Sequence, residues 1–388
     1  MDDLIRQQND KLRDHMLQLT DPEGWRETID ETERSLDAIK GSPWLPNIRT
    51  VFIVGHGTSY ATAQLVESWI SKISRIHAVA LPAFRFAEYT EEHLIDPESA
   101  LVIAISCSGN TSSVVKALER ANESGAATLI ISGRNESNGA LAAHERIATC
   151  ADIEKPAGVS AYTVSHLFMA LAGFRFAVLL GEENGALDES SADLWRSKLS
   201  KTIASLACLP RLFEEMGAVA ASLEEHELKS ICVLGSGPNT GTMTEGALKI
   251  SEFSWMFGAG EELEDFAHGR FREVDSHVGL FVVAPGGPSV SKTMDLLAGS
   301  FVSKTPVIVL TDTPSEPMHK LAKHIVGMPK LDEEYLTPFL YVFPLWFYGW
   351  HVRNNAGHLV GEKRHGLLAV DINYSRHFAA QANKKQSN

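Results

Sequence analysis

Two carboxylates and an ammonium share one face of an expected helix, a set that could move protons. Glu245, Lys249 and Glu252 are spaced i, i+4 and i+7 among apolar neighbours, so all three project to one side of a helix. We expect them near the start of a helix that follows a strand, where ligands bind in α/β sheets. A carboxylate whose pKa is tuned by such neighbours can act as a general base. The alternative is a solvated, salt-bridged helix face that contributes little to stability.

Two turns rich in small polar residues could hold a phosphate. GHGTS spans 55–59, and SCSGNT spans 106–111 just before an expected helix. A helix N-terminus there offers unpaired N–H groups and a partial positive charge to an anion. Such residues are also common helix caps, but two turns that follow neighbouring strands favour phosphate binding. The candidate phosphate-binding residues are Thr58, Ser59, Ser106, Cys107, Ser108, Asn110 and Thr111.

Six apolar runs must position these residues, and they fall into two sets of three. The runs lie at 51–54, 101–105 and 128–131, and again about 180 residues later at 231–234, 280–284 and 307–310. Most are followed by a turn and a stretch with helical spacing, which is typical of parallel strands covered by helices. The constant offset indicates a tandem duplication. We therefore predict an α/β protein with two doubly wound parallel sheets.

The remaining segments complete a four-part division of the chain. We expect an N-terminal helical segment at 1–46, a first domain at 47–183, linker helices at 184–228, and a second domain with a C-terminal tail at 229–388. The first segment is amphipathic, and Thr20-Asp21-Pro22 breaks it into two helices.

Composition excludes several classes of protein. The net charge of −14, without a compensating run of Lys or Arg, argues against a nucleic-acid partner. The sequence lacks a continuous apolar run long enough to span a bilayer and the apolar segment of a secretory signal. Cys107, Cys150, Cys208 and Cys232 are scattered, which fits a reducing compartment and argues against a zinc site. We expect a cytoplasmic protein with no membrane partner, no metal and no organic cofactor.

The motifs resemble those of one known family. GHGTSY at 55–60 and SCSGNT at 106–111 resemble the two phosphate-binding turns of sugar isomerase (SIS) domains, in particular in the isomerase half of glutamine–fructose-6-phosphate amidotransferase. EGALK at 245–249, followed by Glu252, resembles the family's EGALKLKE helix, and His268 with its following glycine falls where the family has a catalytic His-Gly-Pro. The resemblance implies two tandem SIS domains, each a five-stranded parallel sheet flanked by helices in an αβα sandwich.

The resemblance also implies roles for individual residues. Glu252 would move a proton between C1 and C2 of an open-chain sugar phosphate, while Glu245 and Lys249 would tune its pKa. His268 would help open the sugar ring or protonate the leaving group. It would reach into the site of a neighbouring subunit, so a homodimer is implied. Gly57 and Val159 would line the sugar.

Departures from the family pattern bear on the activity. We see no glutaminase domain before the SIS pair and therefore do not expect synthesis of glucosamine 6-phosphate from glutamine. Arg270 stands where the family has proline and, with Arg272, could receive a substrate carboxylate. Neither Lys384 nor Lys385 can be assigned as the family's ring-opening lysine. The turn PGGP at 285–288 lacks hydroxyl groups, so we expect one sugar-phosphate site per chain, in the first domain.

These features favour cleavage of an amino sugar phosphate, as in fructosamine-6-phosphate deglycases or glucosamine-6-phosphate deaminases. A ketose/aldose phosphate isomerase is an alternative, because it requires the same proton movement between C1 and C2. A non-catalytic sugar-phosphate sensor is a second alternative, which a position of Glu252 far from the phosphate turns would favour.

Overall fold

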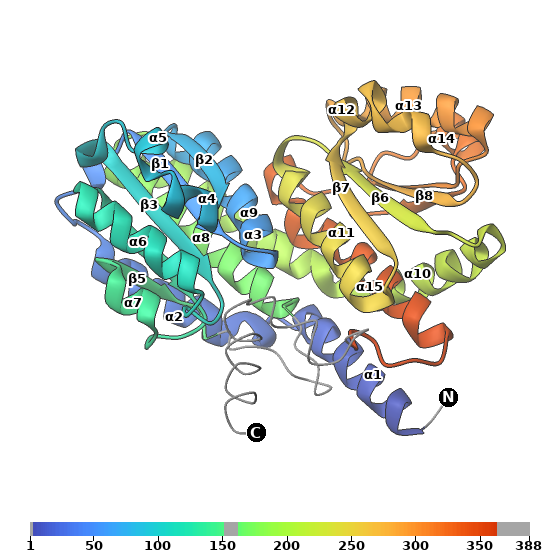
Figure 1. Cartoon of the computed structure of the whole chain (residues 1–388), viewed down its shortest axis with the longest axis horizontal. Coiled ribbons are helices and arrows are strands. Elements are labelled where there is room, and N and C mark those ends of the chain that lie inside the picture. Colours follow the sequence, from blue (N-terminus) through green and yellow to red (C-terminus); the bar gives the residue numbers. More distant parts are fainter. Residues whose placement is uncertain (1–2, 151–161, 363–388) are drawn as a thin grey trace, which may run out of the picture.

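The fold consists of two five-stranded parallel sheets, one in each half of the chain (Figure 1). The computed structural model describes residues 3–150 and 162–362. The strand order is β2-β1-β3-β4-β5 in the first sheet and β7-β6-β8-β9-β10 in the second, so the two sheets share one topology. This result confirms the predicted fold class of two doubly wound, helix-flanked α/β units.

All six apolar runs form strands, and four further strands complete the sheets. Strands β2, β5, β7 and β10 lie at the sheet edges and are only partly buried, so their sequences are shorter or less apolar than those of the inner strands. The first sheet contains β1 (Thr50–Gly55), β2 (His77–Pro82), β3 (Ala100–Ser106), β4 (Ala127–Ser132) and β5 (Glu145–Ala148). The second contains β6 (Ser230–Gly235), β7 (Phe257–Glu262), β8 (Val278–Val283), β9 (Val307–Thr311) and β10 (His324–Gly327).

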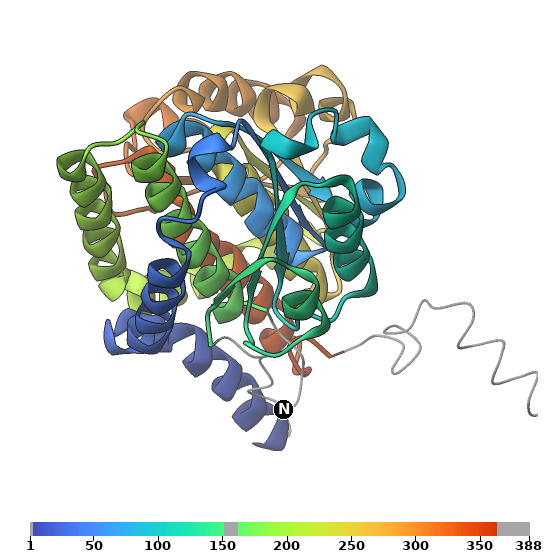
Figure 2. The ribbon, with the colours of Figure 1, turned by 90° about the vertical axis from the view of Figure 1, so that its left-hand side faces the viewer.

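Helices cover both faces of each sheet, as Figure 2 shows for the first domain. The first half contains α1 (Asp3–Leu17), α2 (Glu23–Ile39), α3 (Thr58–Trp69), α4 (Ala83–Glu88), α5 (Thr90–His93), α6 (Ser112–Ser124), α7 (Asn138–Ala142) and α8 (Val164–Glu183). The second half contains α9 (Glu189–Ser205), α10 (Leu209–Leu223), α11 (Thr240–Ser254), α12 (Leu263–His268), α13 (Ser289–Ser303), α14 (Glu316–Leu321) and α15 (Pro338–Asn355).

One continuous apolar core joins the two domains. Side chains alternate along each strand, so one face of the first sheet packs on α4 and α6 while the other packs on α2, α3 and α8. The inner face of the second sheet packs on α10, α11 and α15, and these helices share a single cluster with α3 and α8. Helices α12, α13 and α14 cover the outer face of the second sheet. The inner helices therefore form a common layer between the two sheets.

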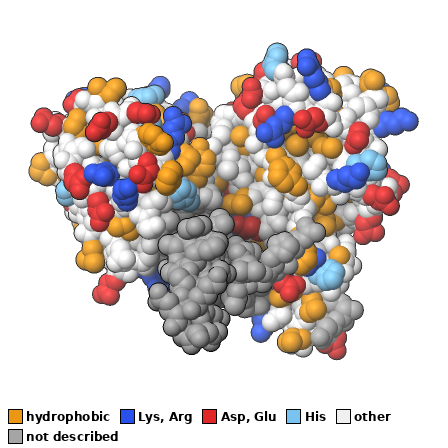
Figure 3. Space-filling model, in the orientation of Figure 1, with side chains coloured by type: hydrophobic (Ala, Val, Ile, Leu, Met, Phe, Trp, Pro, Cys, Tyr) orange, Lys and Arg blue, Asp and Glu red, His pale blue; other side chains and the backbone are white. Residues whose placement is uncertain are grey.

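Helix α8 is buried on almost all sides within this layer. Among the described residues it is the one helix long and apolar enough to cross a membrane by length and composition, yet 89% of its most apolar window is buried inside the molecule. That burial is typical of the core helix of a globular domain. Space-filling atoms show an indentation between the two lobes, with acidic and basic side chains interspersed over this face (Figure 3).

Helices α3 and α11 approach each other closely in the shared layer. A Cβ atom added at Gly241 of α11 would lie 2.4 Å from the carbonyl oxygen of Ala61 in α3, so a larger residue could not occupy this position. Farther along α11, Leu248 lies beside Gly57, which precedes α3. The two helices therefore run in opposite directions, and the later turns of α11 lie beside the start of α3.

The N-terminal helices contact both domains. Helix α1 packs on α15, where Asn9 is fully buried and donates to Asn354 Oδ1 at 2.9 Å. The Asn9 side-chain oxygen also accepts from the backbone N–H of Val360 at 2.8 Å. Helix α2 instead packs against β5 and α8 of the first domain. Helix α1 is thereby attached to α15, the last helix in the described part of the chain.

Candidate active site

The charged set on α11 lies at the boundary between the domains. Lys249 is fully buried, and its Nζ lies 3.0 Å from Glu245 Oε1 and 3.0 Å from Glu252 Oε2. The same nitrogen donates to Thr58 Oγ1, in the first turn of α3, at 2.7 Å. The contact to Thr58 is a hydrogen bond, and the two carboxylates add ion pairs on either side of the ammonium. Lys249 is therefore fixed in position and connects the helix face to the first candidate phosphate turn.

The set lies farther along α11 than the sequence suggested. The helix begins at Thr240, so Glu245 and Lys249 occupy its middle and Glu252 its last turns. The expectation that all three lie near the helix start was wrong. They still reach a candidate ligand site because α11 runs antiparallel to α3, which places its later turns at the strand ends of the first domain.

Burial acts in opposite senses on the two innermost charges. Burial raises the pKa of Glu245 to about 7, although the Lys249 charge works against this rise. Burial by itself would lower the pKa of Lys249, but Glu245 and Glu252 together raise it above its ordinary value. Neither oxygen of Glu245 has a well-oriented hydrogen bond among the described residues, despite the short ion-pair distance. Lys249 is thus a stable cation, while Glu245 can change its protonation state near neutral pH.

Glu252 is the member of the set that a ligand can reach. Its side chain is 40% exposed, whereas those of Glu245 and Lys249 are fully buried. A carboxylate that is held by a fixed ammonium and open to solvent on its other side has the arrangement that a general base requires.

The two candidate phosphate turns are directly connected. His56 Nε2 in the first turn lies 2.8 Å from Ser113 Oγ at the start of α6, immediately after the second turn. Gly57 has a φ of +53°, a conformation that side-chain-bearing residues rarely adopt, and it is exposed. Thr58 is almost fully buried and Ser59 half-buried. Because Thr58 Oγ1 accepts a hydrogen bond from Lys249, the hydroxyl hydrogen of Thr58 can still donate to another acceptor.

Residues of the second turn divide into structural and accessible groups. Ser106 Oγ accepts from the N–H of Gly109 at 3.1 Å, and both Ser106 and Cys107 are buried. Asn110 donates to the Ser108 carbonyl at 2.9 Å and accepts from a backbone N–H at the start of α7, so it braces the turn. Thr111 is exposed where α6 begins. Thr111 therefore has the freest access to a ligand, while the half-buried Ser108 hydroxyl accepts from the N–H of Asn110 at 3.3 Å and keeps its own hydrogen to donate.

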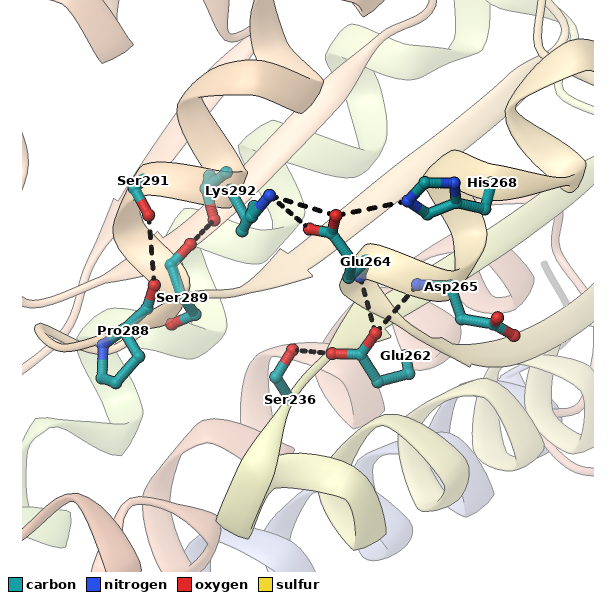
Figure 4. A network of polar contacts seen from close by, with 10 residues as sticks. Ser236, Glu262, Glu264, Asp265, His268, Pro288, Ser289, Ser291 and Lys292 are labelled. Carbon is teal, nitrogen blue, oxygen red and sulfur yellow. Dashed lines mark hydrogen bonds and ion pairs between the residues drawn. The ribbon is translucent and has the colours of Figure 1, made fainter.

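His268 does not meet Glu252 within one chain. It lies at the end of α12, is 75% exposed, and its Nε2 is 3.3 Å from Glu264 Oε1 (Figure 4). Glu264 also pairs with Lys292 at 2.8 Å, which holds the pKa of this carboxyl below its ordinary value. Of the two nearby arginines considered above, Arg270 lies 3.3 Å from Glu261.

Acidic side chains lie at and just after the end of β7, the strand of the second sheet that corresponds to β2 of the first. Glu262 accepts from the Ser236 hydroxyl and from backbone N–H groups at the start of α12 (Figure 4). Hydrogen bonds from these donors outweigh burial and lower its pKa, so this carboxylate is ionised at neutral pH. Ionised groups at Glu262 and Glu264 would repel a phosphate.

Some predicted site residues lie outside the described part of the chain. Val159, expected to line the sugar, falls between residues 150 and 162, and Lys384 and Lys385 follow residue 362.

The sequence analysis missed His166, which belongs to the buried polar network of this site. Its Nδ1 lies 2.8 Å from Thr62 Oγ1, one turn after Thr58 on α3. Both side chains are fully buried. The available signal was a histidine in the apolar first half of α8, but its partner on α3 depends on tertiary packing.

A hollow lies elsewhere between the domains, and none of the predicted site residues lines it. Its volume is about 610 Å³, and its lining includes Glu67, Lys72 and Arg75 from the end of α3 and the following turn. Gly237 and Thr240 line the opposite side. Gly237 follows β6 as Gly57 follows β1, so this hollow occupies the equivalent position in the repeat. Among the described residues that line it, none forms an ion pair like those of Lys249.

Comparison with known proteins identifies relatives of this chain. The SIS domain family model matches residues 45–174. A glutamine–fructose-6-phosphate aminotransferase (isomerizing) from Thermococcus kodakarensis is 25% identical over 329 residues, which are 84% of this chain and 53% of the relative. The chain thus spans about half the length of the curated relatives it matches.

Solved structures show the same fold over most of the chain. The C-terminal domain of a glucosamine-fructose-6-phosphate aminotransferase from Francisella tularensis superposes with a TM-score of 0.76 at 18% identity, covering 90% of this chain and 98% of that domain. A tagatose-6-phosphate ketose/aldose isomerase from Escherichia coli gives a TM-score of 0.68 at 19% identity, covering 88% and 92%. At these identities the likeness concerns the fold.

Proposed function

Because the chain carries a SIS domain at residues 45–174 and repeats its sheet topology in the second half, we propose that it is an enzyme acting on a sugar phosphate. Within that class we propose cleavage of an amino sugar phosphate, of the fructosamine-6-phosphate deglycase or glucosamine-6-phosphate deaminase type. We expect the reaction to occur in the cytoplasm.

One observation carries the proposal. Lys249 donates to Thr58 at 2.7 Å while pairing with Glu252 at 3.0 Å, so a phosphate turn and a general-base candidate share one fixed cation. A phosphate held by the hydroxyl groups of Thr58, Ser59 and Ser108 would leave the sugar carbons extending from the turn. The accessible carboxylate of Glu252 is then the group available to take a proton from C1 or C2.

Each charged residue has a distinct part in the proposed reaction. Glu252 transfers the proton between C1 and C2, which generates an enediol or enamine in which negative charge develops on oxygen. Lys249 holds the Glu252 carboxylate in place by their ion pair and supplies positive charge nearby during the transfer. Glu245, with its pKa near 7, can take up or release a proton and keeps the buried charge balanced.

His268 completes the proposed site from a second subunit. Within one chain its exposed ring lies beside Glu264 and away from Glu252. We propose that in a homodimer it enters the partner's site and supplies a proton to the leaving nitrogen, while a water molecule adds to the imine carbon that the proton transfer has generated and provides the oxygen that replaces this nitrogen. Arg270, two residues later, would then be placed to meet the carboxylate of an amino-acid leaving group.

The two alternatives predict different products. An isomerase would need the same Glu252 transfer and no departure of nitrogen, so the ion-pair geometry fits it equally well. A sensor would not require the charged set beside the phosphate turn, and the Lys249–Thr58 contact therefore favours an enzyme.

The test measures two things in one experiment: incorporation of deuterium into the sugar and release of its nitrogen. Purified protein is incubated in deuterated water with fructose 6-phosphate, glucosamine 6-phosphate or an amino-acid-linked fructosamine 6-phosphate, and the products are followed by NMR. We expect release of ammonia or amine with deuterium at C1 or C2, and loss of both in Glu252→Gln. Glu316→Gln, which changes an exposed carboxylate on α14, is the matched control and should keep full activity.

The other possible results of this experiment distinguish the two alternative functions. Deuterium incorporation or ketose–aldose conversion without release of nitrogen would assign the isomerase reaction. Binding of all three compounds without exchange would contradict the enzyme proposal and favour the sensor.

A further inference from the structure

His166 is a fully buried histidine in the first turn of α8, next to the charged set. Helix α3 presents the hydroxyl of Thr62 and the backbone carbonyl of Thr58 to it, and α15 presents the edge of Trp346 with ring centroids 6.1 Å apart. Helix α11 contributes the nearby charge of Lys249, which acts on the imidazole through space. The ring therefore faces one cation among the described residues around it.

Hydrogen-bond geometry defines the tautomer of this ring. Thr62 Oγ1 lies 3.0 Å from the Thr58 carbonyl oxygen, which can only accept, so the single Thr62 hydroxyl proton is directed there. The 2.8 Å contact between Thr62 Oγ1 and His166 Nδ1 must then use a proton on Nδ1. Burial, reinforced by the charge of Lys249, lowers the pKa of His166 to about 3, so the ring is neutral and Nε2 carries a lone pair. Among the described residues, this Nε2 has no hydrogen-bond partner.

Packing alone does not account for a histidine here. The neighbouring positions of α8 are mostly apolar, and an apolar side chain would fill the same space without burying an unpaired nitrogen. What a leucine would not supply is the Nδ1–H that holds the Thr62 hydroxyl. That hydroxyl in turn is bound to the carbonyl of Thr58, whose side chain accepts from Lys249.

We propose that His166, neutral and protonated on Nδ1, is a positioning residue of the candidate site, which through Thr62 orients Thr58 and the ammonium bound to it. This inference rests on the proposed function for its effect on turnover, but its structural part is independent of any substrate. It predicts that the Nδ1 donor, and not the ring as such, is what the site requires.

Two variants separate the donor from the bulk of the side chain. His166→Asn places an amide N–H at a position comparable to Nδ1, whereas His166→Leu removes the donor and keeps an apolar side chain of similar reach. We expect His166→Leu to lower kcat roughly 10- to 100-fold, because a displaced catalytic group costs a factor of this size. We expect His166→Asn to stay within about threefold of the unmodified protein, with KM less affected than kcat in both variants.

The pH profile gives a readout that loss of packing would not move. If Thr58 and Lys249 shift in His166→Leu, the ion pair between Lys249 and Glu252 is disturbed, and the acid limb of the kcat profile moves from its original position. His166→Asn should retain the original acid limb. Equal impairment of the two variants, or an unchanged profile and rate in folded His166→Leu, would overturn the proposal.

Nitrogen NMR tests the tautomer in the unmodified protein. With ¹⁵N-labelled histidine, the His166 signals should show a protonated Nδ1 and an unprotonated Nε2 throughout pH 5–8, assigned by their absence in His166→Asn. A proton on Nε2 or a charged ring would refute the proposal even if His166→Leu failed to fold.

The proposed function and this inference can fail separately. If the unmodified protein turns over none of the three sugar phosphates, the proposed function fails. Calorimetric binding of fructose 6-phosphate then replaces kcat as the readout, and His166→Leu should bind about 10-fold more weakly than His166→Asn. Equal binding by both variants would refute the role of the Nδ1 donor.

Discussion

The unusual ionisation of Glu245 predicts a specific dependence of stability on pH. Glu245 is fully buried, and its pKa is raised from an ordinary value of 4.5 to about 7. A carboxyl group whose pKa is raised on folding stabilises the protein fully below its unfolded pKa, and this stabilisation disappears as pH rises through the folded pKa. Between pH 5 and pH 8, the Glu245 contribution to the free energy of unfolding should therefore fall by roughly 2–3 kcal/mol.

Substitution by glutamine isolates this contribution. In Glu245→Gln the side chain has nearly the same shape but does not titrate, so its share of the pH dependence disappears. Urea unfolding followed by tryptophan fluorescence at pH 5 and pH 8 gives the change in unfolding free energy for each protein. The change from pH 5 to pH 8 should be roughly 2–3 kcal/mol smaller in the variant. All other titrating groups are shared and cancel in this comparison.

Glu316→Gln provides the matched control, because its exposed carboxylate pairs only with Lys320 in the same helix. It should show the pH dependence of the unmodified protein. If Glu245→Gln also shows that dependence, Glu245 remains ionised beside Lys249 across this range, and the reasoning from burial is refuted.

Three further predictions concern the site and its supports. Glu252→Gln and His268→Ala should each be inactive alone, but an equimolar mixture that exchanges subunits should recover about a quarter of the activity, since half the dimers contain one intact composite site; no recovery would place His268 outside its partner's site. Thr58→Val should weaken binding of fructose 6-phosphate about 10-fold in calorimetry, because it removes a hydroxyl donor and an acceptor for Lys249; unchanged affinity would exclude Thr58 as a phosphate ligand. Gly241→Val should destabilise the protein by about 3 kcal/mol or more in urea unfolding, because its side chain would clash with the Ala61 carbonyl of α3; wild-type stability would contradict the close approach of the two helices.

Buried strands were predictable because the central positions of each sheet are apolar on both faces. The runs at 101–105 and 280–284 correspond to β3 and β8, which lie inside their sheets. Strand β7 gave no such signal, since its sequence is FGAGEE. Its glycines instead permit α11 to lie directly on the strand, where a Cβ at Gly258 would be 2.3 Å from the Ala247 carbonyl oxygen. That requirement comes from a neighbouring helix and cannot be read from hydrophobic periodicity.

The parts of the candidate site that depend on residue spacing within one helix or on neighbouring strands could be predicted from the sequence. The i, i+4, i+7 spacing correctly placed three charged residues on one helix face, and the expected proximity of the two turns agrees with the His56–Ser113 contact. The contact from Lys249 to Thr58 depends on how two domains pack, and the neutral state of His166 depends on burial next to Lys249. Neither follows from the spacing of residues along the chain.

The sequence separation of the site's contacts has a consequence for biosynthesis. Lys249 and Thr58 are 191 positions apart, and Asn9 and Asn354 are 345 positions apart. During translation the first sheet can fold as its strands emerge, but its inner helices stay without their covering layer until α11 and α15 have left the ribosome. During that interval the incomplete nascent chain would expose the apolar side of α3 and α8. A chaperone that recognises exposed apolar surface would bind the chain most readily at this stage. Activity should therefore appear only after α11 and α15 have been made, since the proposed site combines residues from both halves of the chain.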